Sequence, residues 1–125
     1  MDYQQDLILS STTIDGTKAH NLQDEKLGSI KDLMIDVESG RVVYAVLSVN
    51  EGFLNLDSKY FAIPFQALQF DTKNEIVRLD VNKERLEKSP GFDKDHWPTA
   101  PQREFIDEVY SYYGYESYYN TRTAL

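Results

Sequence analysis

Between residues 7 and 81, short apolar segments alternate with clusters of turn residues, a pattern typical of an all-β barrel or sandwich. Leu7, Leu9 and Ile14 fall near the first expected strand, which is interrupted before Asp15-Gly16. Further along, apolar residues recur at every second position, so that Leu33, Ile35 and Val37 are expected on one face of a second strand.

The next two features are a turn and a strand that is apolar on both faces. Glu38-Ser39-Gly40 predicts a tight hairpin turn, because Gly40 can adopt a positive φ angle. The strand over 41–49 then places apolar side chains on both sides, with Val43, Ala45, Leu47 and Val49 on one and Val42, Tyr44 and Val46 on the other. The outward face of a small barrel is normally wet, so the second apolar side needs a cover. Either a helix of this chain or a second subunit can supply it.

A further strand over 60–65 contains Pro64, which cannot donate to a ladder and so marks a strand edge or end. The segments 67–70 and 75–81 predict a hairpin across 71–74. Asn82 is expected to cap a short helix over 83–88, which must end before Pro90.

After Trp97 the apolar period changes from 2 to 3.6, which predicts a C-terminal α-helix. Thr99 and Gln102 have capping-box spacing, and Gly114 is a suitable end. The apolar stripe consists of Phe105, Ile106, Val109, Tyr110 and Tyr113. The expected organisation is therefore a barrel domain over 1–98, a helix over 99–114 packed on the barrel or on a partner, and a flexible aromatic tail over 115–125.

Length and composition narrow the class of protein. A chain of 125 residues suits one domain, and its 41% hydrophobic and 27% charged residues are ordinary for a globular protein. Without cysteine it has no disulfide framework and no thiol chemistry. No apolar run is long enough to span a bilayer, and the N-terminus does not resemble a signal peptide, so neither membrane insertion nor secretion is expected and a cytoplasmic location is the default. The net charge of −8 and the scattered basic residues argue against direct nucleic-acid binding.

The segment 88–98, KSPGFDKDHWP, carries the candidate chemistry, with Asp93 and Asp95 beside His96. Neighbouring side chains of an extended segment point in opposite directions, which does not favour an Asp95–His96 pair. Phe92 and Trp97 are better interpreted as apolar plugs in a seam between barrel and helix, with bends set by Pro90-Gly91 and Pro98. A small-molecule site or a minor enzyme using these three polar residues is the alternative.

Other catalytic or metal sites find no support in the residue pattern. The two histidines, His20 and His96, are too few for a typical zinc site, and Asp32 and Asp36 would stand about 13 Å apart on a strand. The six glycines are dispersed and form no phosphate-binding loop. We therefore expect no catalytic residue, no metal and no cofactor.

Tyrosine is concentrated near the C-terminus, with six of the nine between 110 and 119. Tyr110 and Tyr113 are expected to pack the helix on the barrel. Tyrosine is common at protein interfaces, and the hypothesis for a partner or dimer contact comprises Val42, Tyr44, Val46, Tyr112, Tyr115, Tyr118 and Tyr119.

Five segments in order, LGSIKDLMID at 27–36, GRVVYAVLS at 40–48, GFLNLDSKYFAIPF at 52–65, LDVNKERLEKSPGF at 79–92 and HWP at 96–98, resemble the PRC-barrel domain. This domain is found in the photosynthetic reaction centre H subunit and in RimM. The shared structural positions are Gly28, Gly40, Gly52, Phe53, Pro64, Pro90, Gly91, Phe92 and Trp97. Glu51, Asn55 and Phe65 depart from the family's usual glycine, glycine and tryptophan.

The resemblance implies a small β-barrel of about six strands, with a short helix after the last strand. It also implies an interaction module and brings no catalytic residues. The expected function is thus that of a small, non-enzymatic adaptor that forms a homodimer and binds a protein partner. A role linked to RNA is conceivable only indirectly, through a ribosomal protein.

Overall fold

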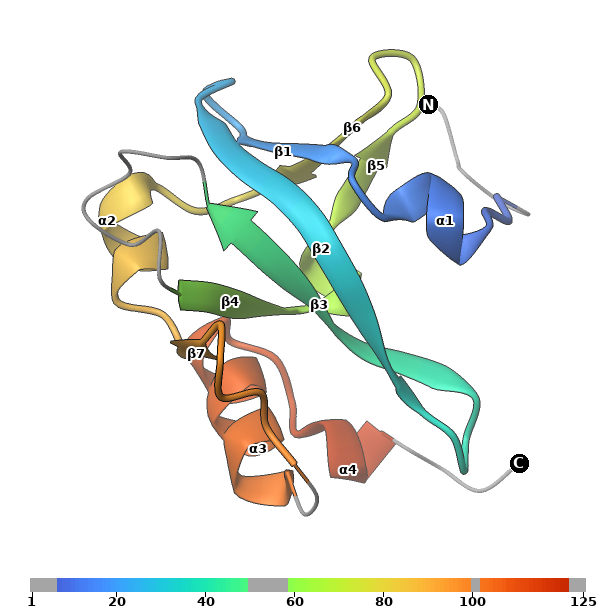
Figure 1. The fold of residues 1–125 in the computed structure, drawn as a ribbon, viewed down its shortest axis with the longest axis vertical. Coiled ribbons are helices and arrows are strands. Elements are labelled where there is room, and N and C mark those ends of the chain that lie inside the picture. The colour runs from blue at the N-terminus through green and yellow to red at the C-terminus, as the bar shows by residue number, and fades with distance from the viewer. Residues whose placement is uncertain (1–6, 50–58, 100–101, 122–125) are drawn as a thin grey trace.

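The computed structural model describes residues 7–49, 59–99 and 102–121. Its centre is one seven-stranded sheet, in the order β5-β6-β1-β2-β3-β4-β7 (Figure 1). The strands are β1 (Lys18–Asn21), β2 (Lys26–Asp36), β3 (Arg41–Val49), β4 (Lys59–Pro64), β5 (Gln69–Asp71), β6 (Ile76–Leu79) and β7 (Gly91–Asp93). Neighbouring strands are antiparallel except β1 and β6, which are parallel.

The fold is mostly β, as expected. Its seven-stranded sheet is open, however, and is not the barrel of about six strands that the sequence predicted. Strands β5 and β7 are its two edges and do not pair with each other. Each edge strand is only three residues long, which leaves little backbone for a closing ladder. The short helix expected at 83–88 is present as α2 (Lys83–Glu87), and the Asn82 side chain accepts a hydrogen bond from the Arg85 N–H at 2.7 Å.

The N-terminal strand expected near Leu7, Leu9 and Ile14 does not form. Residues 7–10 are irregular and exposed, and Ser11–Ile14 is a short helix, α1. The cause is local, because the Ser10 side chain accepts a hydrogen bond from the Thr13 N–H at 3.1 Å and caps the turn. Only Ile14 of the three apolar residues is buried, and the first strand begins after Gly16.

The β2–β3 hairpin is the longest paired element, and two irregularities in its register change which side chains face inward. At the turn, the Gly40 N–H donates to the Asp36 carbonyl at 2.7 Å with Gly40 at φ +76°, as the sequence predicted. The first irregularity in the register lies between Ile30 and Asp32, and the second lies between Met34 and Ile35, where the partners change from Tyr44 to Val42. Val43 is the extra residue on the partner strand.

This bulge corrects two expectations about strand faces. Val43 packs in the same cluster as Tyr44 and Val46 and not with Ala45, Leu47 and Val49. On β2, Leu33 is partly buried, whereas Ile35 is 55% and Val37 is 89% exposed. A strict two-residue alternation therefore fails toward the tip of the hairpin.

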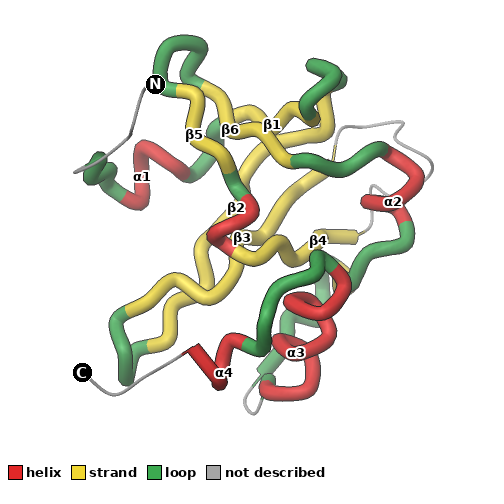
Figure 2. Tube along the Cα trace, turned by 180° about the vertical axis from the view of Figure 1, so that it is seen from behind, coloured by secondary structure: helices red, strands yellow, loops and turns green. Residues whose placement is uncertain are grey.

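Two apolar clusters lie on the two faces of β3. The first fills the inside of the curved sheet and includes Ala45, Leu47, Phe61, Val77 and Leu86. The second lies between β3, β4 and the C-terminal helix α3 (Arg103–Tyr112), where Val46, Ala62 and Val109 have no exposed surface (Figure 2). The helix of this chain thus supplies the cover that the second apolar face of β3 required.

The C-terminal elements differ from the expected capping box and loose tail. The residue before α3 is Gln102, whose side chain makes no capping hydrogen bond and instead accepts one from the Tyr44 hydroxyl at 2.9 Å. Beyond Gly114, residues 118–121 form a short helix, α4 (Tyr118–Thr121), and Tyr118 is 1% exposed. The segment 115–121 is therefore held against the sheet by a buried aromatic ring.

Gly28 is the position where the β2–β3 contact leaves no room for a side chain. A Cβ atom there would lie 1.9 Å from the Ser48 carbonyl oxygen, whereas one at Gly40 would meet nothing within 4 Å. We expect Gly28→Ala to lower the free energy of unfolding by about 3 kcal/mol, because the backbone of two strands must separate. Gly40→Ala should cost about 1 kcal/mol for its positive φ alone. Urea unfolding of both variants measures the difference, and equal losses would contradict the predicted close approach.

Candidate docking surface

A groove lies between the tip of the β2–β3 hairpin and helices α3 and α4, and we call it the hairpin groove. Figure 1 shows the positions of these elements. Its volume is about 210 Å³. The lining residues come from segments far apart in the chain and are Met34, Ile35, Asp36, Val43, Tyr44, Gln102, Ile106, Tyr118 and Tyr119. The position of the C-terminal segment against the hairpin therefore creates this surface.

Tyr118 holds that segment in place. Its hydroxyl donates to Asp36 Oδ2 at 2.6 Å and lies 3.0 Å from Ser39 Oγ, which itself donates to Asp36 Oδ2. The Arg41 guanidinium stacks over the Tyr118 ring at 5.0 Å and donates to the Thr121 carbonyl at 3.0 Å. All three partners flank the hairpin turn, so α4 and the turn fix each other.

The floor of the groove is aromatic, and the Asp36 carboxylate in the lining accepts hydrogen bonds from Tyr118 and Ser39. Tyr44 is 1% exposed, and burial raises the pKa of its hydroxyl well above the usual range. Beside it, the Tyr110 hydroxyl donates to the Val43 carbonyl at 2.6 Å, and burial, the largest influence on it, raises its pKa to about 12. Neither hydroxyl ionises near neutral pH, so the floor offers apolar surface and satisfied hydrogen bonds.

The rim of the groove is where apolar surface reaches solvent. Ile35 lies opposite Val42 in the ladder, so the two side chains share a face, and Val37 stands exposed at the turn. On the helical side, the Arg103 guanidinium lies 4.3 Å from the centre of the Tyr119 ring. A partner that covers this rim would bury aliphatic and aromatic surface with one cation beside it.

The structure brings together part of the contact set proposed from sequence. Tyr44, Tyr118 and Tyr119 all line the hairpin groove, although Tyr44 and Tyr118 are buried within the chain, as is Val46. Val42 is partly exposed.

The other two tyrosines of that set lie elsewhere. Tyr112 packs on Arg85, with the guanidinium 5.0 Å from its ring, and Tyr115 is 36% exposed beside Tyr110.

Sequence reasoning missed Ile35 and Val37 as surface residues. Their alternation with polar neighbours is the pattern of a buried face, and nothing local marks the bulge that turns them outward. Two of the positions shared with the PRC-barrel pattern, Gly52 and Phe53, lie outside the described residues.

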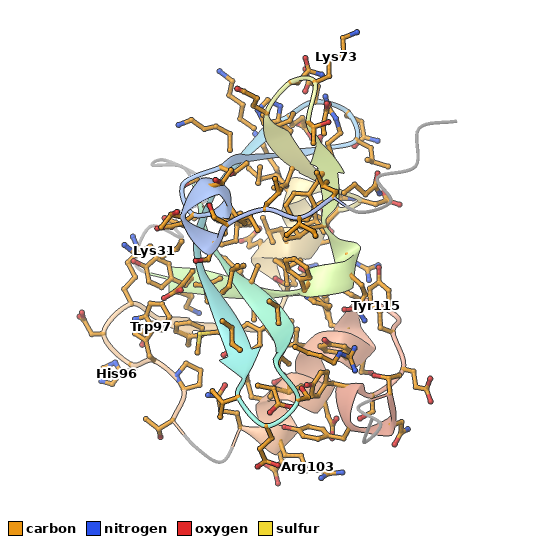
Figure 3. All side chains as sticks on the ribbon, turned by 90° about the vertical axis from the view of Figure 1, so that its right-hand side faces the viewer. Lys31, Lys73, His96, Trp97, Arg103 and Tyr115 are labelled. Carbon is orange, nitrogen blue, oxygen red and sulfur yellow. The ribbon has the colours of Figure 1, made fainter. Side chains whose placement is uncertain are left out.

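The segment 88–98 forms a seam between sheet and helix. The Phe92 ring lies 5.1 Å from that of Trp97 and 6.2 Å from that of Phe105 on α3, and Tyr60 of β4 contacts both Phe92 and Trp97. The His96 side chain is 82% exposed at the outer edge of the molecule, and its Nδ1 lies 4.0 Å from Asp93 Oδ2 (Figure 3). Its ring thus faces solvent while its neighbour Trp97 packs inward.

Across 7–49, 59–99 and 102–121, no three His, Asp or Glu side chains come together as metal ligands would. In the same ranges, no helix has both the length and the apolar character needed to cross a membrane.

Comparison with known proteins places the chain in a family. The family model for the PRC-barrel domain matches residues 8–86, more than half of the chain, and the chain therefore belongs to the PRC-barrel family, as the sequence resemblance indicated. Among solved structures it is similar to a protein described as the 16S ribosomal RNA processing protein RimM of Pseudomonas aeruginosa, with 19% identity and a TM-score of 0.45. That match covers 61% of this chain and 45% of the other, so this chain spans less than half of that protein's length. No curated protein matches.

The role of Tyr118 can be tested by removing only its hydroxyl. Tyr118→Phe leaves the ring buried but breaks the hydrogen bonds to Asp36 and Ser39, and we expect a loss of about 1–2 kcal/mol in the free energy of unfolding. Tyr115→Phe, at an exposed ring, should change it by less than about 0.5 kcal/mol. Chemical denaturation compares the two, and equal effects would show that the hydroxyl does not anchor α4.

The buried tyrosines also predict a pH dependence. The pKa of Tyr110 is raised to about 12 from the usual 10.0, so the unfolded chain releases this proton at lower pH than the folded one. The stability that Tyr110 contributes is therefore complete below pH 10 and is lost as the pH rises toward 12. Titration of tyrosinate absorbance should show a late-ionising fraction in the folded protein that disappears in denaturant. A single transition near pH 10 in both states would contradict the predicted burial.

Proposed function

We propose that this PRC-barrel chain is a non-enzymatic adaptor that binds another protein through the hairpin groove. The main support is the exposed apolar rim at Ile35 and Val37, which lies directly beside a groove lined by tyrosines. Interfaces are enriched in aromatic residues and depend on a few anchors in preformed pockets. The rigid floor lowers the cost of binding, because α3 and the Tyr118 hydrogen bonds already hold the lining side chains.

Homodimerisation is part of the proposal and uses the same face, so a second copy and another protein would compete for it. The second apolar face of β3, which was expected to need a cover, is covered by α3 of the same chain. What remains exposed is the outer rim, where Ile35 and Val42 form a cross-strand pair. In a symmetric dimer each hairpin would place this pair against that of the second copy.

The polar residues of the alternative enzyme hypothesis do not support catalysis. An effective general base is oriented by a partner and faces a substrate pocket. His96 is mostly exposed, its nearest carboxylate oxygen is 4.0 Å away, and neither Asp93, Asp95 nor His96 lines the hairpin groove. A cytoplasmic location and the absence of direct RNA binding remain predictions from the sequence.

Ile35→Asp tests the proposed interface, because a charge at position 35 should prevent a partner from burying the rim. A photo-crosslinking amino acid at Val37 should give a discrete product in cells with the otherwise native chain, and Ile35→Asp should reduce that product at least about tenfold. The fold should be unchanged, because Ile35 is 55% exposed. Mass spectrometry of the product distinguishes a second copy from another protein.

The matched control places the same crosslinker at Glu104, an exposed position on α3. It should give no discrete product. A product of equal yield from both positions, or one insensitive to Ile35→Asp, would contradict docking at the hairpin groove. Light scattering of the purified chain decides the dimer separately, and a monomeric mass at high concentration would remove that part of the proposal.

A further inference from the structure

A second groove lies between α1 and the β5–β6 hairpin, and we call it the α1 groove. Figure 2 shows these elements, which lie away from α3 and α4. Its volume is about 380 Å³, larger than that of the hairpin groove. The lining residues are Leu9, Thr13, Ile14, Thr17, Phe70, Asp71, Thr72, Glu75 and Ile76. It borders β5, the edge strand that leaves the sheet open.

The apolar part of this surface continues beyond the groove. Leu9 lies in its wall and is 36% exposed, and the two preceding residues, Leu7 and Ile8, are 37% and 88% exposed. Three consecutive exposed aliphatic residues beside an apolar groove form a hydrophobic patch. Exposure of such a patch to water is unfavourable, and patches of this kind often mark binding sites. The size suits one or two large apolar side chains.

The charged side chains that line the groove are all acidic. Its lining contains two carboxylates, Asp71 and Glu75, and no Lys, Arg or His. Asp71 is already engaged, because Arg78 Nη2 lies 3.2 Å from its Oδ2 and the Asn74 amide donates to the same oxygen at 2.9 Å. Glu75 has no hydrogen-bond or ion-pair partner within the described residues. Lys73, in the turn between the two acids, extends away from the molecule (Figure 3).

The backbone at Glu75 adds an independent observation. Glu75 has φ +58°, in the left-handed region that disfavours residues with a Cβ, and Gly or Asn is common there. An asparagine stands one position earlier, at Asn74, so the chain carries a suitable residue next to the position that needs it. The turn holds the Glu75 carboxylate, which has no hydrogen-bond or ion-pair partner within the described residues, at the edge of the apolar groove.

We propose that the α1 groove binds a protein segment in which a large aliphatic side chain lies next to a lysine or arginine. The aliphatic side chain fills the space between Ile14, Phe70 and Ile76, and the cation pairs with Glu75. We infer a different protein and not a second copy of this chain as occupant, because two copies that each carry a net charge of −8 repel one another. The groove is separate from the hairpin groove, so this proposal stands or falls independently of the proposed function.

The test is a titration of the isotope-labelled chain, followed by amide chemical shifts, with three capped pentapeptides. KLIRG carries both the aliphatic and the cationic groups, ELIEG reverses the charge, and KSSRG lacks the aliphatic side chains. We expect KLIRG at millimolar concentration to shift the amides of Thr13, Thr17, Phe70 and Ile76, and the other two to bind at least about threefold more weakly. Salt at about 0.5 M should weaken KLIRG binding, because the ion pair is exposed.

Glu75→Gly separates a binding role from a structural one. Glycine relieves the left-handed backbone, so the variant should unfold at higher denaturant concentration than the native chain, yet it should bind KLIRG about two- to fivefold more weakly. Glu104→Gln, which removes the same charge from α3, should leave binding unchanged. Leu9→Ser should weaken KLIRG binding through the aliphatic contact without unfolding the chain, since Leu9 is already partly exposed.

Several results would overturn the proposal. These are absence of shifts at the groove with KLIRG, equal binding of ELIEG, or full binding by Glu75→Gly. Shifts of the same amides on concentrating the chain alone would identify a second copy as the occupant and would also refute it.

Discussion

The fold depends on the need to cover strand β3 on both faces. Ala45, Leu47 and Val49 close the interior of the curved sheet, while Tyr44 and Val46 require a second apolar layer. Each large side chain fully buried in this way contributes about 1.5–3 kcal/mol. The C-terminal helix follows from this requirement, because without it the most apolar strand of the chain would face water on one side. The sheet and α3 therefore share one apolar layer.

The same requirement explains how residues 118–121 are held against the sheet. Helix α4 is only four residues long and would not be stable alone. It is fixed by the buried Tyr118 ring and by the hydrogen bonds to Asp36 and Ser39 at the hairpin turn. Arg41, just after the hairpin turn, also donates a hydrogen bond to the Thr121 carbonyl of α4. This mutual fixation shapes the hairpin groove and presents Ile35 and Val37 to solvent at its rim.

The two grooves have different chemistry. The hairpin groove has an aromatic floor, the hydrogen-bonded Asp36 carboxylate in its lining and Arg103 beside its rim. The α1 groove has aliphatic walls and the carboxylates of Asp71 and Glu75, with no cation in its lining. Surfaces of such different charge select different partners. The proposed adaptor role would use both grooves, which lie at different ends of the open sheet.

The sequence by itself determined the family, most strands, the turn at Gly40, the Asn82-capped helix and the apolar stripe of α3, because these follow from residue period and turn chemistry within a few positions of the chain. It also indicated that Phe92 and Trp97 belong to packing. It did not determine that the sheet stays open, that residues 11–14 form a helical turn, that Val43 faces α3, or that Tyr118 is buried. Those features depend on which residues meet across strands. One extra residue in β3 reverses the face of its neighbours, and only the partner strand β2 shows where that residue is.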